Sequence, residues 1–202
     1  MTSTAGRADP AARSGAPVTG VLLAAGRGLR FGGGKLLARL AGGELVGVAA
    51  CRQLVAVIPA VIAVVRPGDD ELAAALAGAG ARVVSCPEAD AGMGASLACG
   101  VRAAIAARGW IVALADMPWI RVETIAAVAA AVGAGATLAA PFHGGVRGHP
   151  VGFGAACGPA LAALADDFGA RSLVAAHAGA LLRIDVDDPG VLRDVDTPRD
   201  LA

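Results

Sequence analysis

The sequence predicts one α/β domain of three layers, with helices on both faces of a mainly parallel sheet and a small hairpin insertion. Three observations predict it. Short apolar runs alternate with longer segments of helical periodicity, as in consecutive βαβ units. The runs are apolar on both faces, as strands of a buried parallel sheet are. The length of 202 residues suits a single domain with a full core.

The elements are expected in a βαβ order up to residue 140. Strands are predicted at 18–24, 60–65, 81–86, 110–115 and 136–140, and helices at 44–55, 69–78, 95–107 and around 125–132. Three acids at 69–71 stand where the dipole of a helix N-terminus favours negative charge. In the helix at 95–107, Leu97, Val101 and Ile105 share one face at i, i+4 and i+8, which predicts a buried stripe.

After Pro141 the pattern changes. Gly144-Gly145 separates two short extended stretches, which predicts the hairpin. Two short helices, a strand near 181–186 and the ending DVDTPRDL follow, so we expect the domain to span residues 18–202. Residues 1–17 are small, polar and proline-bearing without an apolar core. They are predicted to be a disordered tail and not a secretory signal.

Composition argues against several classes of partner. The formal net charge is +0 and the pI about 6.8, so neither nucleic acid nor an acidic membrane surface is expected. The apolar stretch 54–65 has only 12 residues, fewer than the ~20 that cross a bilayer, and Pro59 interrupts it. The uncharged stretch 124–142 contains two glycines and Pro141. A helix followed by a buried strand is the interpretation that it favours.

The four cysteines predict neither a disulfide framework nor a zinc site. They stand at positions 51, 86, 99 and 157, without a CxxC pair or a histidine at zinc-ligand spacing. Since no secretory signal is predicted, we expect reduced thiols, mostly buried, in a cytoplasmic protein.

The stretch LLAAGRGLRFGGGKLL, residues 22–37, follows the first strand, where ligands bind in open α/β sheets. Its glycines and cations predict a loop that holds phosphate. A dinucleotide GxGxxG motif would need glycine where Phe31 stands, and the second strand ends in Arg66 instead of an acid for a ribose. A P-loop would need glycine at Leu29 and a hydroxyl residue at Leu36. The sequence therefore disfavours both of these loops.

The spacing LAAGxGxRxxxxK resembles the signature loop of nucleotidyltransferases that join a nucleoside triphosphate to a phosphorylated small molecule. The matching residues are Leu23, Ala24, Ala25, Gly26, Gly28, Arg30 and Lys35. Two small alanines allow a base to approach the backbone, and the glycines expose N–H groups to phosphate oxygens. The arginine and lysine can neutralise the triphosphate and the charge that grows on its α-phosphate. The alternative is a flexible glycine loop with two solvated cations.

Four further stretches stand in the order found in one branch of that family. They are AGMGASLACGV at 91–101, LADMP at 114–118, RGHPVGF at 147–153 and DVDTPRDL at 194–201. With the loop, they resemble the MobA-like molybdopterin nucleotidyltransferases over residues 18–202, most closely the molybdenum cofactor cytidylyltransferases. The resemblance implies a Rossmann-like nucleotide-diphospho-sugar transferase fold. It also implies transfer of CMP from CTP to the terminal phosphate of molybdopterin, with release of pyrophosphate. A molybdoenzyme or its maturation chaperone is a further implied partner.

The resemblance also implies Mg²⁺ as cofactor and two carboxylates that hold it. Asp116, in LADMP, is the first, and with Lys35 and Arg30 it forms the expected catalytic set. Asp196 is the second, with Asp194 as the other choice. Magnesium needs only one or two carboxylates when phosphate oxygens complete its shell. The alternatives are a turn aspartate before a proline and an aspartate that caps the last helix.

The remaining candidates form two groups. Contacts to the base and ribose are expected from Gly92, Met93 and Ser96, and contacts to the second substrate from Arg147, His149 and Arg171. The histidine is expected to line the pocket and not to act as a base, because the attacking phosphate is already ionised. The alternatives are helix capping by the serine and solvated surface arginines.

One match to the cytidylyl branch and two departures from the family pattern remain. Ala25 favours CTP, because the branch that uses GTP typically has LAGG here and the methyl group would exclude the larger purine. Glu44 stands where relatives commonly have proline, in a loop that contacts the second substrate, and Phe31 replaces methionine. Four alternatives stay open: a GTP-dependent guanylyltransferase, a different phosphorylated acceptor, a non-catalytic cofactor carrier, and a dinucleotide-dependent oxidoreductase.

Overall fold

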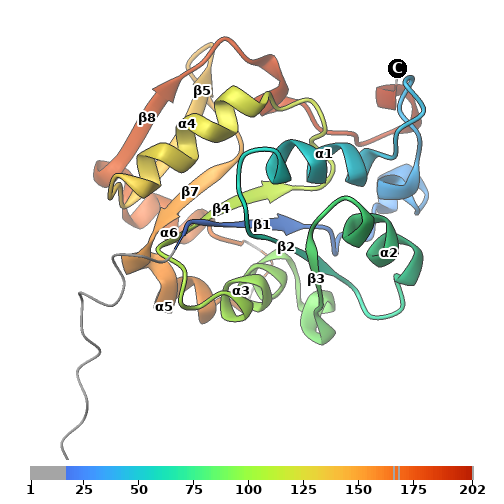
Figure 1. Cartoon of the computed structure of the whole chain (residues 1–202), viewed down its shortest axis with the longest axis horizontal. Helices are drawn as coiled ribbons and strands as arrows, with labels where there is room; N and C mark the ends of the chain where they lie inside the picture. Colours follow the sequence, from blue (N-terminus) through green and yellow to red (C-terminus); the bar gives the residue numbers. More distant parts are fainter. Residues whose placement is uncertain (1–16, 166, 168, 202) are drawn as a thin grey trace, which may run out of the picture.

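A computed structural model describes residues 17–165, 167 and 169–201 (Figure 1). The predicted tail at 1–17 lies outside these residues except for residue 17. The described part is a three-layer α/β/α domain, as predicted. None of its helices combines the length and apolar character that crossing a membrane requires.

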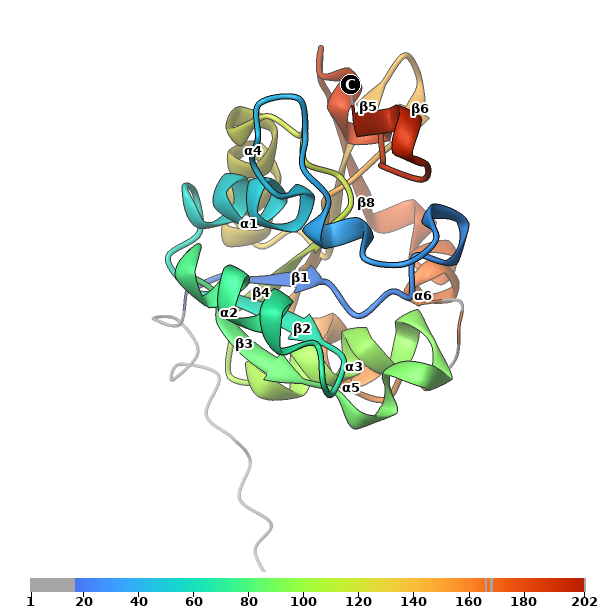
Figure 2. The same cartoon turned by 90° about the vertical axis from the view of Figure 1, so that its right-hand side faces the viewer.

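The sheet has the strand order β3-β2-β1-β4-β7-β5-β6, with β8 paired to β5. Four strands form its parallel half: β1 (Thr19–Leu23), β2 (Val61–Val65), β3 (Arg82–Ser85) and β4 (Gly109–Leu114). The other half contains β5 (Leu138–His143), β6 (Val146–Arg147), β7 (Val151–Gly154) and β8 (Leu181–Asp185). β7 runs antiparallel between β4 and β5, whereas β8 is parallel to β5. The sheet is therefore mainly parallel, and Figure 2 looks onto its edge at the carboxyl end of β1.

Helices cover both faces of this sheet (Figure 1). One face carries α1 (Val46–Val55), α2 (Asp70–Gly78) and α4 (Val122–Gly133); the other carries α3 (Met93–Ala103), α5 (Gly158–Ala162) and α6 (Arg171–Ala176). Successive strand residues alternate between the two cores. Leu22 packs on the α1, α2 and α4 side, and Val21 packs on the α3 side, because side chains of a strand point to opposite faces.

The predicted helix at 95–107 is wrong at both ends. It begins at Met93 and ends at Ala103, so Ile105 is 56% exposed and does not extend the buried stripe. The Ala104 carbonyl accepts bonds from Ala107 N–H at 3.0 Å and from the indole of Trp110 at 3.2 Å. In a longer helix this carbonyl would accept from residue 108. The helix therefore ends where β4 packs against it.

The segment after residue 135 confirms the hairpin and adds one strand. β5 and β6 pair His143 with Val146 around the two predicted glycines. β5 begins at Leu138 and continues to His143, so it starts and ends later than predicted. β7 was not predicted, because only four residues form it and two of them are glycines. A Cβ at Gly152 would lie 2.5 Å from Val132, so α4 packs directly on this backbone.

Candidate active site

The phosphate loop begins where β1 leaves the sheet. Ala24 N–H still donates to Val64 at 2.9 Å, and the Leu23 carbonyl accepts from Ala115 at 3.1 Å. Beyond that point, the backbone N–H groups of residues 26–30 donate to no described carbonyl. Gly28 has φ +58°, and a Cβ there would lie 3.2 Å from the Cβ of Lys35. The loop thus presents several backbone N–H groups without a described partner, and its backbone at Gly28 packs against Lys35.

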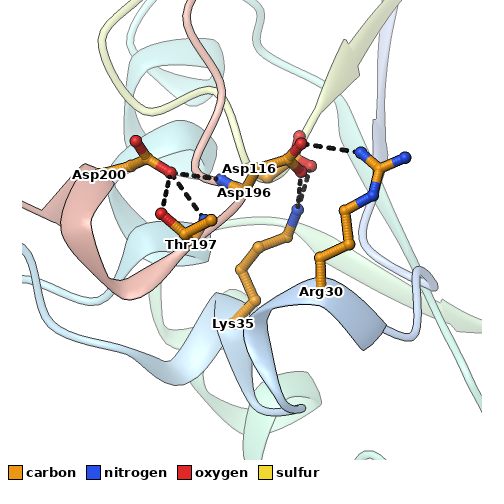
Figure 3. A network of polar contacts seen from close by, with 6 residues as sticks. All are labelled: Arg30, Lys35, Asp116, Asp196, Thr197 and Asp200. Carbon is orange, nitrogen blue, oxygen red and sulfur yellow. Dashed lines mark hydrogen bonds and ion pairs between the residues drawn. The ribbon is translucent and has the colours of Figure 1, made fainter.

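Lys35 joins this loop to the end of β4. Its Nζ lies 2.7 Å from Asp116 Oδ2 and 3.7 Å from Asp196 Oδ1 (Figure 3). The lysine side chain is only 13% exposed, so this contact is largely shielded from bulk water. Arg30 approaches the same place, with its Nη1 3.0 Å from Asp196 Oδ2. The four residues predicted as catalytic or metal-binding therefore form one cluster.

The C-terminal motif is fixed beside Asp116 by its backbone. Val195 N–H donates to the Asp116 carbonyl at 2.8 Å. Asp200 Oδ2 accepts three bonds, from Asp196 N–H at 3.1 Å, Thr197 N–H at 2.7 Å and the Thr197 hydroxyl at 2.8 Å (Figure 3). Asp200 therefore carries the capping contacts of the last turn, a 3₁₀ helix at Pro198–Leu201. The Asp196 carboxylate is left to face the two cations.

The carboxylates of the cluster repel one another. Burial raises the pKa of Asp194, and the charges of Asp196 and Asp116 raise it further. Such a set favours a bound cation. Among the described residues no group of three or more potential ligands is arranged as a metal site. Two carboxylates facing one ammonium fit Mg²⁺, which would take its other ligands from phosphate and water.

A cavity of about 400 Å³ opens between the loop and α3, and we call it the α3 cavity. Seven of the predicted nucleotide-binding residues line it: Leu23, Ala25, Gly26, Gly92, Met93, Ser96 and Asp116. Gly92 has φ +122°, and a Cβ there would lie 2.5 Å from the Cα of Asp167, so no larger residue fits. Gly28, Arg30 and Lys35 line a neighbouring space of about 290 Å³ with Asp196. A base and its phosphates thus have adjoining spaces.

The expectation that both Ala24 and Ala25 would contact the base is not met by the geometry. Ala25 lines the α3 cavity, whereas Ala24 lines a cavity of about 500 Å³ on the other side, the α2 cavity. The two side chains point to opposite faces because the backbone is still extended there. Of the two alanines, only Ala25 lines the α3 cavity.

Met93 and Ser96 were predicted to lie just before a helix, but both lie inside α3. The hydroxyl of Ser96 donates to the Gly92 carbonyl at 3.3 Å, and Gly92 is the N-cap residue. Capping of this helix by the serine is therefore excluded. Both residues line the α3 cavity. Ser96 is 5% exposed, whereas Met93 is 45% exposed.

The three residues predicted for the second substrate act on one another electrostatically. Burial lowers the pKa of His149 to about 4, and the charges of Arg147 and Arg171 lower it as well, while Asp116 opposes them. Nδ1 of His149 is buried and has no hydrogen-bond partner in the described structure. Arg147, on β6, and Arg171, at the start of α6, are exposed. A neutral imidazole thus lies near two exposed cations.

Seven charged residues that line the two cavities were not predicted as site residues: Arg27, Arg66, Asp69, Asp70, Glu71, Asp90 and Asp167. Arg27 and Arg66 line both the α2 and the α3 cavity, and Asp90 lines the α3 cavity. Arg66 could have been found, because it follows β2 at the edge where ligands bind. Asp90 precedes a recognised motif, but its pairing with residues 27 and 66 depends on the strand order.

Comparison with known proteins agrees with this geometry. The model of the MobA-like NTP transferase domain matches residues 20–181. The chain belongs to this family. The match includes the loop after β1 and the carboxylate after β4, whereas the C-terminal motif at 194–201 lies beyond it.

Individual relatives of this family member carry different names. Nicotine blue oxidoreductase of Paenarthrobacter nicotinovorans is 33% identical over 188 residues, 89% of this chain and 92% of that protein. Purine catabolism protein PucB of Bacillus subtilis is 34% identical over 118 residues, so the match spans only 57% of either protein. The crystal structure of Rv0371c from Mycobacterium tuberculosis has a TM-score of 0.78 at 28% identity, covering 92% of this chain and 95% of that one. Rv0371c has also been solved in complex with manganese.

Proposed function

We propose that this family member is a magnesium-dependent nucleotidyltransferase that transfers CMP from CTP to the terminal phosphate of molybdopterin, which already carries molybdenum. Pyrophosphate is the second product. The observation that carries the proposal is the convergence of Lys35 with Asp116 and Asp196 beside a cavity lined by Ala25. The five motifs that resemble the molybdopterin branch support the choice of acceptor.

The chemistry is an in-line displacement at phosphorus. An oxygen of the acceptor phosphate attacks the α-phosphorus of CTP, and the bond to the β-phosphate oxygen breaks as pyrophosphate leaves. No residue has to remove a proton, because the attacking phosphate is ionised at neutral pH. Lys35 and Arg30 stabilise the charge on the phosphoryl oxygens, and the N–H groups of residues 26–30 hold the triphosphate.

Asp116 and Asp196 would hold the Mg²⁺ ion. The ion supplies charge neutralisation on the triphosphate when it is bound. In the protein alone, the Lys35 ammonium lies against both carboxylates, so its positive charge balances theirs in place of the metal ion. With both carboxylates on the ion, the Lys35 ammonium would be available to contact phosphate oxygens. The manganese complex of Rv0371c is a relative's precedent for a divalent cation.

The acceptor would lie against Arg147, His149 and Arg171. The charges of both arginines and of Asp116 act on the same imidazole. Two exposed arginines suit a phosphate. The unpartnered Nδ1 of His149 suits a neutral hydrogen-bonding group of the pterin, since the ring stays uncharged. The function assigned to the histidine is recognition and not acid–base catalysis.

Pyrophosphate release tests the proposal directly. The full chain is assayed with Mg²⁺, molybdopterin that carries molybdenum, and CTP, GTP, ATP or UTP in turn. We expect turnover that needs both substrates and is fastest with CTP. Equal or faster turnover with GTP would identify a guanylyltransferase instead. Asp116→Ala is expected to abolish turnover; unchanged cofactor delivery to a molybdoenzyme by that variant would identify a carrier.

A second candidate is a dinucleotide-dependent oxidoreductase, and the relative named nicotine blue oxidoreductase is the observation that favours it. The loop opposes it, because residues 29–31 form only a short 3₁₀ turn and Phe31 occupies the glycine position of a dinucleotide motif. A thermal-shift titration compares CTP–Mg²⁺ with NADPH. Stabilisation by NADPH alone would favour the oxidoreductase.

A further inference from the structure

Two cavities meet at a thin wall of charged side chains. The α3 cavity, about 400 Å³, and the α2 cavity, about 500 Å³, share only Gly26, Arg27 and Arg66 among their lining residues. The glycine contributes no side chain. The boundary between the two spaces is therefore formed by two arginine side chains.

One carboxylate holds both arginines. Asp90 Oδ1 accepts from Arg27 Nη2 at 2.8 Å and from Nη2 of Arg66 at shorter range. The Arg66 side chain is 21% exposed, and its Nη1 lies 3.5 Å from the carbonyl oxygen of Ala25. Two guanidinium groups that converge on one point repel each other unless an anion lies between them. Asp90 supplies that anion.

We propose that Arg66, positioned by Asp90, sets the size of the base-binding space and so determines nucleotide selectivity together with Ala25. This inference rests on the proposed nucleotidyl transfer. Arg66 lines both cavities, so shortening its side chain would enlarge the space beside Ala25 toward the α2 cavity. The second ring of a purine needs such additional room, and Arg66→Ala is therefore expected to favour GTP.

The wall also presents a charge pattern. Arg66 donates and Asp90 accepts, so a base edge that carries an acceptor beside a donor would complement the pair. All four bases offer such an edge, so this pattern would support binding of a base without choosing between CTP and GTP. The selectivity is therefore assigned to the space that the Arg66 side chain occupies.

Calorimetric titration of nucleotides tests the inference without the acceptor. Dissociation constants for CTP–Mg²⁺ and GTP–Mg²⁺ are measured on the wild-type chain, Arg66→Ala and Asp90→Ala. We expect the ratio of GTP to CTP dissociation constants to fall by about tenfold in each variant, the order that one pocket group contributes to discrimination. The matched controls are Glu88→Ala, in the same 3₁₀ turn at Pro87–Ala91, and Arg82→Ala, on β3. Both controls line neither cavity and should keep the wild-type ratio.

The outcomes separate the wall from the proposed function. If Arg66→Ala keeps the wild-type ratio of dissociation constants and the wild-type unfolding midpoint, the proposal that Arg66 determines nucleotide selectivity is refuted. A changed ratio in Arg66→Ala with none in Asp90→Ala overturns the role of Asp90. If a variant fails to fold, Arg66→Gln and Asp90→Asn, which keep the volume, take its place and are expected to show the same direction. If the wild-type chain binds CTP selectively but releases no pyrophosphate, the proposed function is refuted. The role of Arg66 in nucleotide selectivity would then still be supported.

Discussion

The buried carboxylate of Asp188 fastens the segment that leads to the C-terminal motif. It is 2% exposed and accepts bonds from Thr124 Oγ at 2.7 Å, Arg121 N–H at 2.9 Å and Gly190 N–H at 3.0 Å. Asp188→Ala leaves two of these donors, on Thr124 and Gly190, buried without a partner. At roughly 1 to 3 kcal/mol for each, the free energy of unfolding should fall by about 2 to 6 kcal/mol. Domains of this kind are stable by only about 5 to 15 kcal/mol.

Denaturant unfolding of the full chain, followed by circular dichroism, measures this loss. The neighbouring Asp187→Ala is the matched control, because that side chain is exposed and only its backbone carbonyl is bonded, by Arg121 at 2.7 Å. The control should change the free energy of unfolding by less than about 0.5 kcal/mol. A loss below about 1 kcal/mol in Asp188→Ala would show that water satisfies the abandoned donors, and the reasoning from burial would be refuted.

Three further outcomes are expected. Lys35→Met should lower the rate of pyrophosphate release by roughly 100- to 1,000-fold, as loss of a charge-stabilising donor does, and an unchanged rate would exclude the lysine from the reaction. Asp200→Asn should raise the Mg²⁺ concentration needed for half-maximal activity, because it weakens the bonds that hold Asp196; an unchanged Mg²⁺ dependence would contradict this. The pKa of His149 is about 4 in the folded chain and ordinarily about 6.5, so its contribution to stability is present above pH 6.5 and is lost as the pH falls toward 4. Unfolding profiles of wild type and His149→Gln should therefore diverge across that window, and parallel profiles would refute the assignment.

The resemblance of five motifs to one family implied that the cations of the loop and the carboxylates of Asp116 and Asp196 would lie together. Lys35 and Asp116 meet because loops that follow parallel strands share one edge of the sheet. Arg30 and Asp196 are separated by 166 positions yet lie 3.0 Å apart, and the bond from Val195 N–H to the Asp116 carbonyl brings the C-terminal motif there. The layers, the parallel half of the sheet and the hairpin were predictable because they depend on local periodicity and turn residues.

Most of the predictions that were wrong concern contacts between segments that lie far apart in the sequence. The end of α3 at Ala103 is determined by the indole of Trp110, which no helical pattern reveals. The place of β7 between β4 and β5 is a matter of strand order, and four residues with two glycines give little signal. The opposite directions of the Ala24 and Ala25 side chains could have been predicted. Side chains alternate along a strand, and the predicted strand needed only to be continued by one residue into the loop.

The distance in sequence between the two halves of the cation–carboxylate cluster has a consequence for biosynthesis. Lys35 is synthesised early, whereas Asp196, 3.7 Å from it in the folded chain, is added 161 positions later. At about 5 to 20 residues per second, roughly 10 to 30 s separate the two on the ribosome. During that time Arg30 and Lys35 lack the carboxylate that the C-terminal motif supplies. Chains interrupted before residue 194 would lack one of the two carboxylates that face the lysine.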